Sequence, residues 1–206
     1  MDELNAMSLH VFEYLGTLSA VSNVEYKPSP GIQLHNIALW EQRNAPKKLP
    51  LDLVAFLGAS NGLSVKWYTT LKAKQHLVGH FALNSLQHMR KIDADFPDGN
   101  YLALVLDSSK IMGDVCLVFK SNDQAEVWLR DVMSNWILLA RTFADYYRLM
   151  IVHLGLIGWQ ALFTPVGLDP LTKQWFHLFV PGRLRQLTSP DKHATTSAQI
   201  PILPFL

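Results

Sequence analysis

The sequence predicts an α+β fold built as a single domain. Apolar residues recur at helical spacing near both ends of the chain, and strand-like runs are grouped between residues 63 and 129. An order in which helices come first, strands follow as a group and helices come last is typical of α+β proteins. In proteins built from βαβ units, helices and strands would alternate along the chain. With 206 residues and 49% hydrophobic content, the chain is long enough to bury most of its apolar surface in one core.

The N-terminal part is predicted to be mainly helical. Apolar residues at near-helical spacing indicate an opening amphipathic helix of about four turns, namely Leu4, Met7, Leu9, Val11, Phe12, Leu15 and Leu18. A short strand at residues 21–27 and a short helix ending near Asn44 follow. The next helix starts at Pro50, whose missing N–H costs nothing in a first turn, and stops at Asn61 and Gly62, which tolerate left-handed backbone.

The middle of the chain is predicted to form a mainly antiparallel sheet of about five strands. Runs rich in Val, Leu and aromatic residues indicate strands at 63–69, 76–83, 101–106, 115–120 and 125–129. The acidic stretch at residues 90–100, with Pro97 and Gly99, has the composition of a polar loop.

A long helix is predicted after the sheet. Its apolar residues step by four and three alternately and form one broad face, Trp136, Ala140, Phe143, Tyr147, Met150 and Leu154. Two short aromatic segments follow, residues 159–163 and 172–179, which are expected to be short helices packed on the domain. The domain is predicted to cover residues 1–180, and the polar stretch that begins at 181 predicts a flexible tail at 181–206.

Composition argues against several functional classes. Eighteen Lys and Arg against seventeen Asp and Glu leave a net charge of +1, so the chain lacks the basic surplus that neutralises a phosphate backbone. No run of roughly 18 apolar residues could span a bilayer, and the acidic start lacks the features of a secretory signal. The single Cys116 lies in an apolar strand and favours a reducing compartment. We therefore expect a cytoplasmic protein that binds neither nucleic acid nor membrane.

The candidate metal ligands are weak. His76 and His80 are four residues apart, but on a strand they would share one face with a long gap and no third ligand. Asp93, Asp95 and Asp98 alternate as oxygen ligands can, yet the Gly and closing Glu of a calcium loop are not in place. Half-buried histidines and a solvated turn explain these residues better, so we predict no metal site.

No catalytic or cofactor-binding constellation stands out. Cys116 has apolar neighbours that would raise the pKa of its thiol, and no serine lies in a strand-to-helix elbow. A phosphate-binding glycine loop is also missing, since Gly155 and Gly158 lack the flanking strand and lysine. We predict neither catalysis nor a cofactor, and an enzyme would have to assemble its site from residues dispersed in the sequence.

Binding residues are predicted on the long helix and beyond it. Arg141, Asp145 and Arg148 are spaced four and three apart, so they can pair with one another as a solvated stripe or contact a partner. Four tryptophans lie in apolar patterns and are expected in the core, namely Trp40, Trp67, Trp128 and Trp136. Two lie in the late aromatic segments and could belong to the core or to an interface, namely Trp159 and Trp175. The full predicted partner-binding set is Arg141, Asp145, Arg148, Trp159, Phe163, Trp175 and Phe176.

The order of several motifs resembles a known family. The segments DVCLVFKS, EVWLRD, TFADYYRLMIVHLGL, GWQALFTPVGLDP and KQWF follow one another between residues 114 and 176, and WEQRN with LPLDLVAFLGASNGLSVKW precede them at 40–44 and 49–67. Over residues 4–180 the chain resembles the tubulin polyglutamylase complex subunit 2 family, and its N-terminal half is similar to the wider SUKH superfamily of immunity-protein-like domains. It departs from the family pattern in a shortened acidic insertion at 90–100 and in an apolar end, IPILPFL, where the family has a basic tail.

The resemblance implies a SUKH-like domain that acts as a non-catalytic scaffold or targeting subunit. A separate tubulin-tyrosine-ligase-like chain would carry the ligase chemistry, with other complex subunits as partners. Tubulin or microtubules would be contacted indirectly, through the other subunits. The family's basic tail could bind the acidic tubulin surface, but here an apolar segment stands in its place. The implied location is the cytoskeleton, including centrosome, basal body or cilium. A free-standing SUKH-type protein-binding module and an axonemal microtubule-associated structural protein stay open as alternatives.

Overall fold

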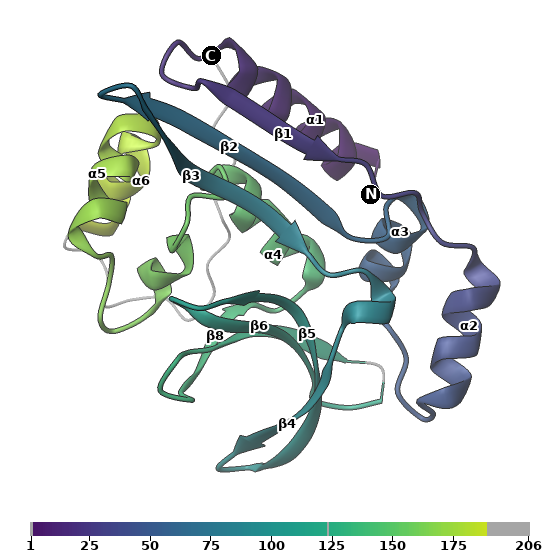
Figure 1. Ribbon diagram of the computed structural model, residues 1–206. Helices are drawn as coiled ribbons and strands as arrows, with labels where there is room; N and C mark the ends of the chain where they lie inside the picture. Colours follow the sequence, from purple (N-terminus) through teal and green to yellow (C-terminus); the bar gives the residue numbers. More distant parts are fainter. Residues whose placement is uncertain (1, 123, 189–206) are drawn as a thin grey trace.

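A computed structural model describes residues 2–122 and 124–188 of the chain. Within them, helices pack around two antiparallel sheets, which confirms the predicted α+β class (Figure 1). The strands number eight in two sheets, rather than about five in one. The predicted similarity to the SUKH superfamily remains a prediction.

The first sheet has the order β1-β2-β3 and is built from β1 (Asn23–Lys27), β2 (Leu63–Leu71) and β3 (Lys74–Leu83). α1 (Asp2–Thr17) precedes β1, and α2 (Leu34–Arg43) and α3 (Leu51–Ala59) connect β1 to β2. These elements confirm the N-terminal predictions. Gly62, with φ of 104°, has the left-handed backbone expected after α3, and the side-chain oxygen of Asn61 accepts a bond of 2.9 Å from the N–H of Leu86.

The second sheet is a meander in which each strand pairs with the next. Its order is β4-β5-β6-β7-β8, formed by β4 (Lys91–Phe96), β5 (Gly99–Ser109), β6 (Gly113–Phe119), β7 (Ala125–Arg130) and β8 (Trp136–Ala140). The polar loop predicted at 90–100 is therefore wrong. The acidic residues belong to a hairpin in which Phe96 pairs with Gly99, and in β4 exposed Asp93 and Asp95 alternate with the inward-facing Ala94.

The predicted long helix is also wrong at its start, because residues 136–140 form β8. The carboxylate of Asp131 accepts bonds of 2.8 Å from the N–H groups of Met133 and Asn135. This turn folds β8 back onto β7, so that backbone pairing replaces the helical option. The helix α4 (Phe143–Val152) begins only after Thr142 and is followed by a left-handed residue, Leu154, with φ of 53°.

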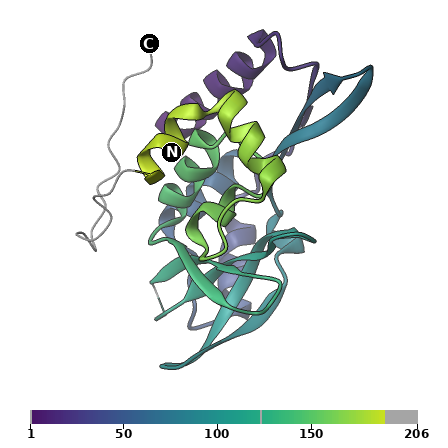
Figure 2. The ribbon, with the colours of Figure 1, turned by 90° about the vertical axis from the view of Figure 1, so that its left-hand side faces the viewer.

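The main core lies where both sheets meet α4. It joins Val65 and Trp67 of the first sheet to Leu104 and Leu117 of the second, with Tyr147 from α4. The helices that follow α4 cover this core from outside, namely the 3₁₀ helix η2 (Trp159–Phe163), α5 (Pro170–Phe179) and α6 (Pro181–Thr188). In Figure 2, α5 and α6 lie at the front of the molecule, with α4 behind them. A second 3₁₀ helix, η1 (Leu86–His88), precedes β4.

The predicted tail at 181–206 begins inside described structure. α6 occupies Pro181–Thr188, so regular structure continues past the predicted boundary at residue 180. Residues 189–206 lie outside the described residues. The division into a domain at 1–180 and a tail remains a prediction.

The second sheet curls around a small cluster of its own. Ala94, Ala103, Val105, Cys116 and Val118 are fully buried on the face turned away from the main core. The ring centroids of Phe96 on β4 and Trp136 on β8 are 5.2 Å apart, although these strands are the two edges of the sheet. A flat sheet would separate them by roughly 19 Å. The curl, visible in Figure 1, is therefore closed by aromatic side chains over small residues.

Lys120 lies over these rings. Its Nζ is 3.8 Å from the centroid of Phe96, 4.1 Å from that of Tyr101 and 5.3 Å from that of Trp128. Its side chain is only 23% exposed, and the carboxylate of Asp98 is 3.8 Å away. A partly desolvated ammonium over aromatic faces is worth about 0.5–2 kcal/mol.

The Lys120→Met variant should therefore lower the free energy of unfolding by about 1 kcal/mol, because it keeps the apolar stem and removes the charge. Urea denaturation followed by tryptophan fluorescence measures this change. Lys110→Met, at an exposed hairpin turn, is the matched control and should change stability by less than about 0.5 kcal/mol. Equal effects of the two variants would show that the rings do not stabilise the Lys120 ammonium.

Candidate partner-binding surface

The predicted charged residues lie at the start of α4. Thr142 is the N-cap, and its hydroxyl oxygen accepts a bond of 3.1 Å from the N–H of Asp145. Arg148 pairs with the carboxylate of Asp145 at 3.2 Å, with about half of each side chain exposed. Asp145 and Arg148 thus share one side of the helix, as predicted. Arg141 does not, because it is exposed before the cap, outside the helix.

α4 is also anchored from α3. The carboxylate of Asp52 accepts a bond of 2.8 Å from the N–H of Ala144, a first-turn donor that the helix itself leaves without a partner. Since Thr142 and Asp52 satisfy the donors of the first turn, the Asp145 and Arg148 pair adds little to stability and is available for contact with a partner.

Trp159 is a core residue, one of the two positions that the sequence left open for it, so it has little surface for its predicted partner-binding role. It is 2% exposed and stacks on His153 with ring centroids 5.2 Å apart and planes 9° apart. His153 is itself buried, and its Nδ1 donates a bond of 2.6 Å to the carbonyl of Leu149. Burial lowers the pKa of His153 to about 4, so the ring is neutral at pH 7.

Phe176 is likewise fully buried, which excludes it as an exposed anchor. Phe163 is 38% exposed at the end of η2, and Trp175 is half-buried with its ring 6.3 Å from that of Phe179. Of the four aromatic residues in the predicted partner-binding set, Phe163 and Trp175 are the two whose side chains are at least partly exposed. Whether any of the predicted residues contacts a partner remains a prediction.

α5 exposes more apolar surface than the sequence analysis expected. Leu171 and Leu178 are 58% and 57% exposed, and their spacing of seven residues places them on one side of the helix with Trp175 between them. We call these three residues the α5 stripe. Val166, 93% exposed, lies in the segment that leads into α5. The spacing of the two leucines in the sequence already indicates the stripe, although only the aromatic residues of this segment were predicted to bind a partner.

Asp169 fixes where α5 begins. Its carboxylate accepts bonds from the N–H groups of Leu171 and Thr172 at 3.0 and 3.1 Å, and Pro170 occupies the first turn. A hydrogen bond from the Thr172 side chain, together with these backbone bonds, lowers the pKa of Asp169. The cap, and the burial of Phe176 on the opposite side, hold the α5 stripe in a fixed orientation toward solvent.

The two candidate histidines do not form a pair. Val78 is an extra residue in β3, since Trp67 pairs with Gly79 while Tyr68 pairs with Leu77. His76 and His80 therefore lie on opposite faces of the sheet rather than on one, and the Nε2 of His80 is 3.2 Å from the hydroxyl of Ser64. Among residues 2–122 and 124–188, no three His, Cys, Asp or Glu side chains are grouped so that they could hold a metal ion.

Cys116 is the buried core residue that the sequence predicts. It is fully buried in the curled sheet, and burial raises the pKa of its thiol to about 12. Its Sγ lies 3.8 Å from the carbonyl oxygen of Asp114. The thiol is therefore neutral at physiological pH and unsuited to nucleophilic attack.

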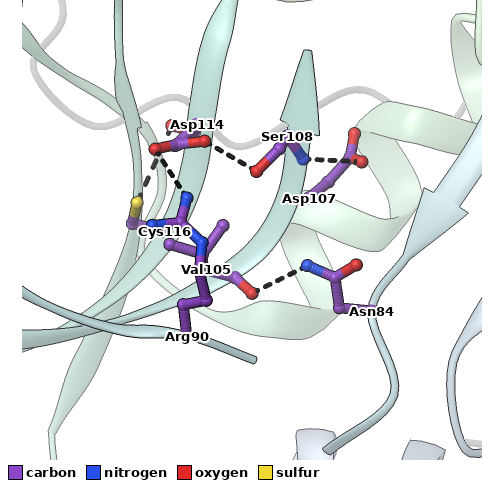
Figure 3. A network of polar contacts seen from close by, with 7 residues as sticks. All are labelled: Asn84, Arg90, Val105, Asp107, Ser108, Asp114 and Cys116. Carbon is purple, nitrogen blue, oxygen red and sulfur yellow. Dashed lines mark hydrogen bonds and ion pairs between the residues drawn. The ribbon is translucent and has the colours of Figure 1, made fainter. Parts of the chain in front are cut away.

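A polar network joins β5, β6 and the segment before β4 beside Cys116 (Figure 3). The carboxylate of Asp114 accepts a bond of 2.6 Å from the hydroxyl of Ser108 and lies 3.4 Å from the guanidinium of Arg90. Ser108 also donates its N–H to Asp107 at 2.8 Å, and nearby Asn84 donates to the carbonyl of Val105 at 3.1 Å. The sequence did not single out these residues, which come from β5, β6 and the segment between β3 and β4.

Within the described part of the chain, no helix is both long and apolar enough to cross a membrane. The fold is an α+β domain whose outer helix α5 leaves apolar side chains in solvent. The chain belongs to the tubulin polyglutamylase complex subunit 2 family.

The family membership depends on curated relatives. The chain is 31% identical over 214 residues to the Homo sapiens tubulin polyglutamylase complex subunit 2, a match that covers 86% of this chain and 70% of the human protein. It is 28% identical over 215 residues to the Mus musculus protein of the same name, covering 86% and 72%. No protein-family model and no solved structure matches the chain.

Proposed function

We propose that the chain is a non-catalytic scaffold subunit of a tubulin polyglutamylase complex. The observation that carries this proposal is the similarity over 86% of the chain to proteins named as a subunit of that complex. A separate tubulin-tyrosine-ligase-like chain supplies the ligase chemistry and further subunits complete the assembly. Tubulin is contacted through these partners, in the cytoplasm and at cytoskeletal structures such as the centrosome, basal body or cilium.

The mechanism of such a subunit is positional. Holding the ligase chain and its companions in one geometry raises the effective concentration of the enzyme at its substrate without any new covalent chemistry. Two features support this reading. The α5 stripe offers Leu171, Trp175 and Leu178 on a capped helix, and the Asp145–Arg148 pair adds a polar contact. Exposed apolar residues and charged residues both occur in protein interfaces, the first at the centre and the second at the rim.

The Leu171→Asp/Leu178→Asp double variant tests the docking surface. Burying two carboxylates in an apolar interface is costly, so recovery of a co-expressed tubulin-tyrosine-ligase-like chain should fall by at least about tenfold, which corresponds to about 1.4 kcal/mol. Because both leucines are exposed, the free energy of unfolding should change by less than about 1 kcal/mol. The measurement is quantitative affinity purification with the full chain as bait.

Leu34→Asp/Leu51→Asp is the matched control, since these leucines on α2 and α3 are 69% and 86% exposed. It should leave recovery unchanged. Loss of recovery in the control alone would move the docking surface to α2 and α3. A wild-type chain that recovers no ligase-like chain and a single unrelated partner would instead favour a free-standing binding module, and glutamate addition by the purified chain alone would refute a non-catalytic role.

A further inference from the structure

A small polar cavity lies beside η2 and is separate from the α5 stripe. It has a volume of about 140 Å³ and opens where the end of β5, one side of α4 and the segment after α4 meet. The residues that line it include Asp107 and Ser108 of β5, Tyr146 of α4, and Gly158 and Gln160 of the segment after α4. Ser108 is exposed, so the cavity is reached from the surface.

A β-bulge places the carboxylate of Asp107 in this cavity. Along β5, Val105 pairs with Cys116 while Asp107 pairs with Val115, which leaves Leu106 as the extra residue. Leu106 and Asp107 therefore both face the main core, where strict alternation would have turned Asp107 to the curled inner face. In Figure 3 the carboxylate of Asp107 points away from Asp114, with Ser108 between the two. The bulge directs one acidic side chain into the polar cavity.

Asp107 has no cationic partner among the described residues. Its carboxylate accepts a hydrogen bond of 2.8 Å from the N–H of Ser108. Arg90 lies against Asp114, on the other side of Ser108. His80, which also lines the cavity, does not supply the charge, because burial and Lys66 lower its pKa and keep the ring neutral. A partly buried carboxylate without a counter-ion is costly, and a cationic ligand in the cavity would offset that cost.

Two more polar side chains line the cavity, those of Tyr146 and Gln160. Tyr146 is 1% exposed and Gln160 is 6% exposed. Among the described residues, no buried side-chain nitrogen or oxygen lacks a hydrogen-bond partner, so these two groups count as polar lining of the cavity and not as buried orphans. With Asp107, they offer three oxygen acceptors from three separate elements.

We propose that this cavity receives the ammonium group of a lysine side chain from a partner protein. An ammonium carries one positive charge and three donors, which matches one carboxylate and two neutral oxygens. A guanidinium would leave most of its five donors without acceptors, and a single carboxylate is too few for a metal ion. The partner would be another subunit, so the origin of the lysine rests on the proposed function, whereas the ammonium specificity of the cavity does not.

The test uses n-butylammonium chloride, a mimic of the lysine side chain, with the isolated full chain. Amide resonances of Ser108, Gly158 and Gln160 should shift saturably in heteronuclear NMR titrations, and 1-butanol should not reproduce the shifts. Asp107→Asn should weaken binding at least tenfold, and Tyr146→Phe should weaken it severalfold. Asp95→Asn, at an exposed carboxylate of β4 that carries the same charge, should bind as wild type.

Absence of saturable shifts, equal shifts with 1-butanol, or undiminished binding to Asp107→Asn would overturn the proposal. If the dispersion of amide resonances shows that Asp107→Asn is unfolded, Tyr146→Phe still decides, because it removes a single oxygen. Failure of the proposed function would appear separately, as loss of complex recovery by a wild-type chain whose cavity still binds n-butylammonium.

Discussion

Trp67→Ala is expected to lower the free energy of unfolding by about 3–5 kcal/mol, the usual cost of truncating a fully buried tryptophan. Trp67 is 0% exposed and contacts three parts of the fold. Its ring meets Phe179 of α5 edge-on at 4.7 Å, its Nε1 donates a bond of 2.8 Å to the carbonyl of Leu154, and Gly79 on β3 leaves it room. A side chain at Gly79 would overlap the indole, so the pocket fits this one residue.

Such a loss is a large part of the 5–15 kcal/mol that stabilises a typical domain, so the variant should unfold at markedly lower urea concentration. The Trp67→Phe variant separates the contribution of ring packing from that of the hydrogen bond to the Leu154 carbonyl. It keeps an aromatic ring but leaves the Leu154 carbonyl without its donor, and should cost about 1–3 kcal/mol. A loss below about 1 kcal/mol for Trp67→Ala would contradict the central position assigned to this residue.

Local signals predicted the elements whose ends are fixed by local chemistry. α3 is bracketed by Pro50 and Gly62, and both ends were predicted because the backbone preferences of these residues act without tertiary help. Trp67 was expected in the core and is confirmed there. Trp128 and Trp136, expected beside it, are only half-buried because they close the curled sheet.

Tertiary pairing decided the elements that the sequence misassigned. Residues 136–140 fit a helical period, but the turn at Asp131 brings them beside β7, where a ladder satisfies their backbone groups. β4 reads as a loop because its exposed face is acidic, and its strand character depends on pairing with β5. Neither pairing is encoded within a short window of sequence.

The binding residues divide in the same way. The pair of Asp145 and Arg148 was predictable, since a spacing of three residues on a helix brings side chains together. The burial of Trp159 was not, because it depends on His153 and Tyr146 of α4 lying against η2. The cavity beside Asp107 depends on a β-bulge, which leaves no clear mark in the sequence.

The second large effect is on the pH dependence of the free energy of unfolding, to which Asp107 and His153 make opposite contributions. Burial raises the pKa of Asp107 from 3.8 to about 6, so between these values the folded state binds more protons and stability falls as pH rises. Burial lowers the pKa of His153 from 6.5 to about 4, so the unfolded state binds more protons and stability rises with pH. Since one pKa unit is worth about 1.4 kcal/mol, each effect is about 3 kcal/mol.

The wild-type chain should therefore show little net change from these two groups between about pH 4 and pH 6.5. In Asp107→Asn only the histidine remains, and stability should fall by about 3 kcal/mol on acidification through this range. In His153→Gln only the carboxylate remains, and stability should instead rise by about 2–3 kcal/mol. Urea denaturation at intervals of half a pH unit measures the slopes, and the double variant is the control in which both slopes disappear.

The sign of each slope is the decisive reading, because it does not depend on the packing lost in either variant. Parallel slopes in Asp107→Asn and His153→Gln would show that at least one of the two groups is not buried as described. Opposite slopes would also mean that ionising Asp107 inside the fold costs stability near pH 7. A charge that costs stability in the isolated chain is then expected to serve in binding, since an incoming ammonium would offset that cost.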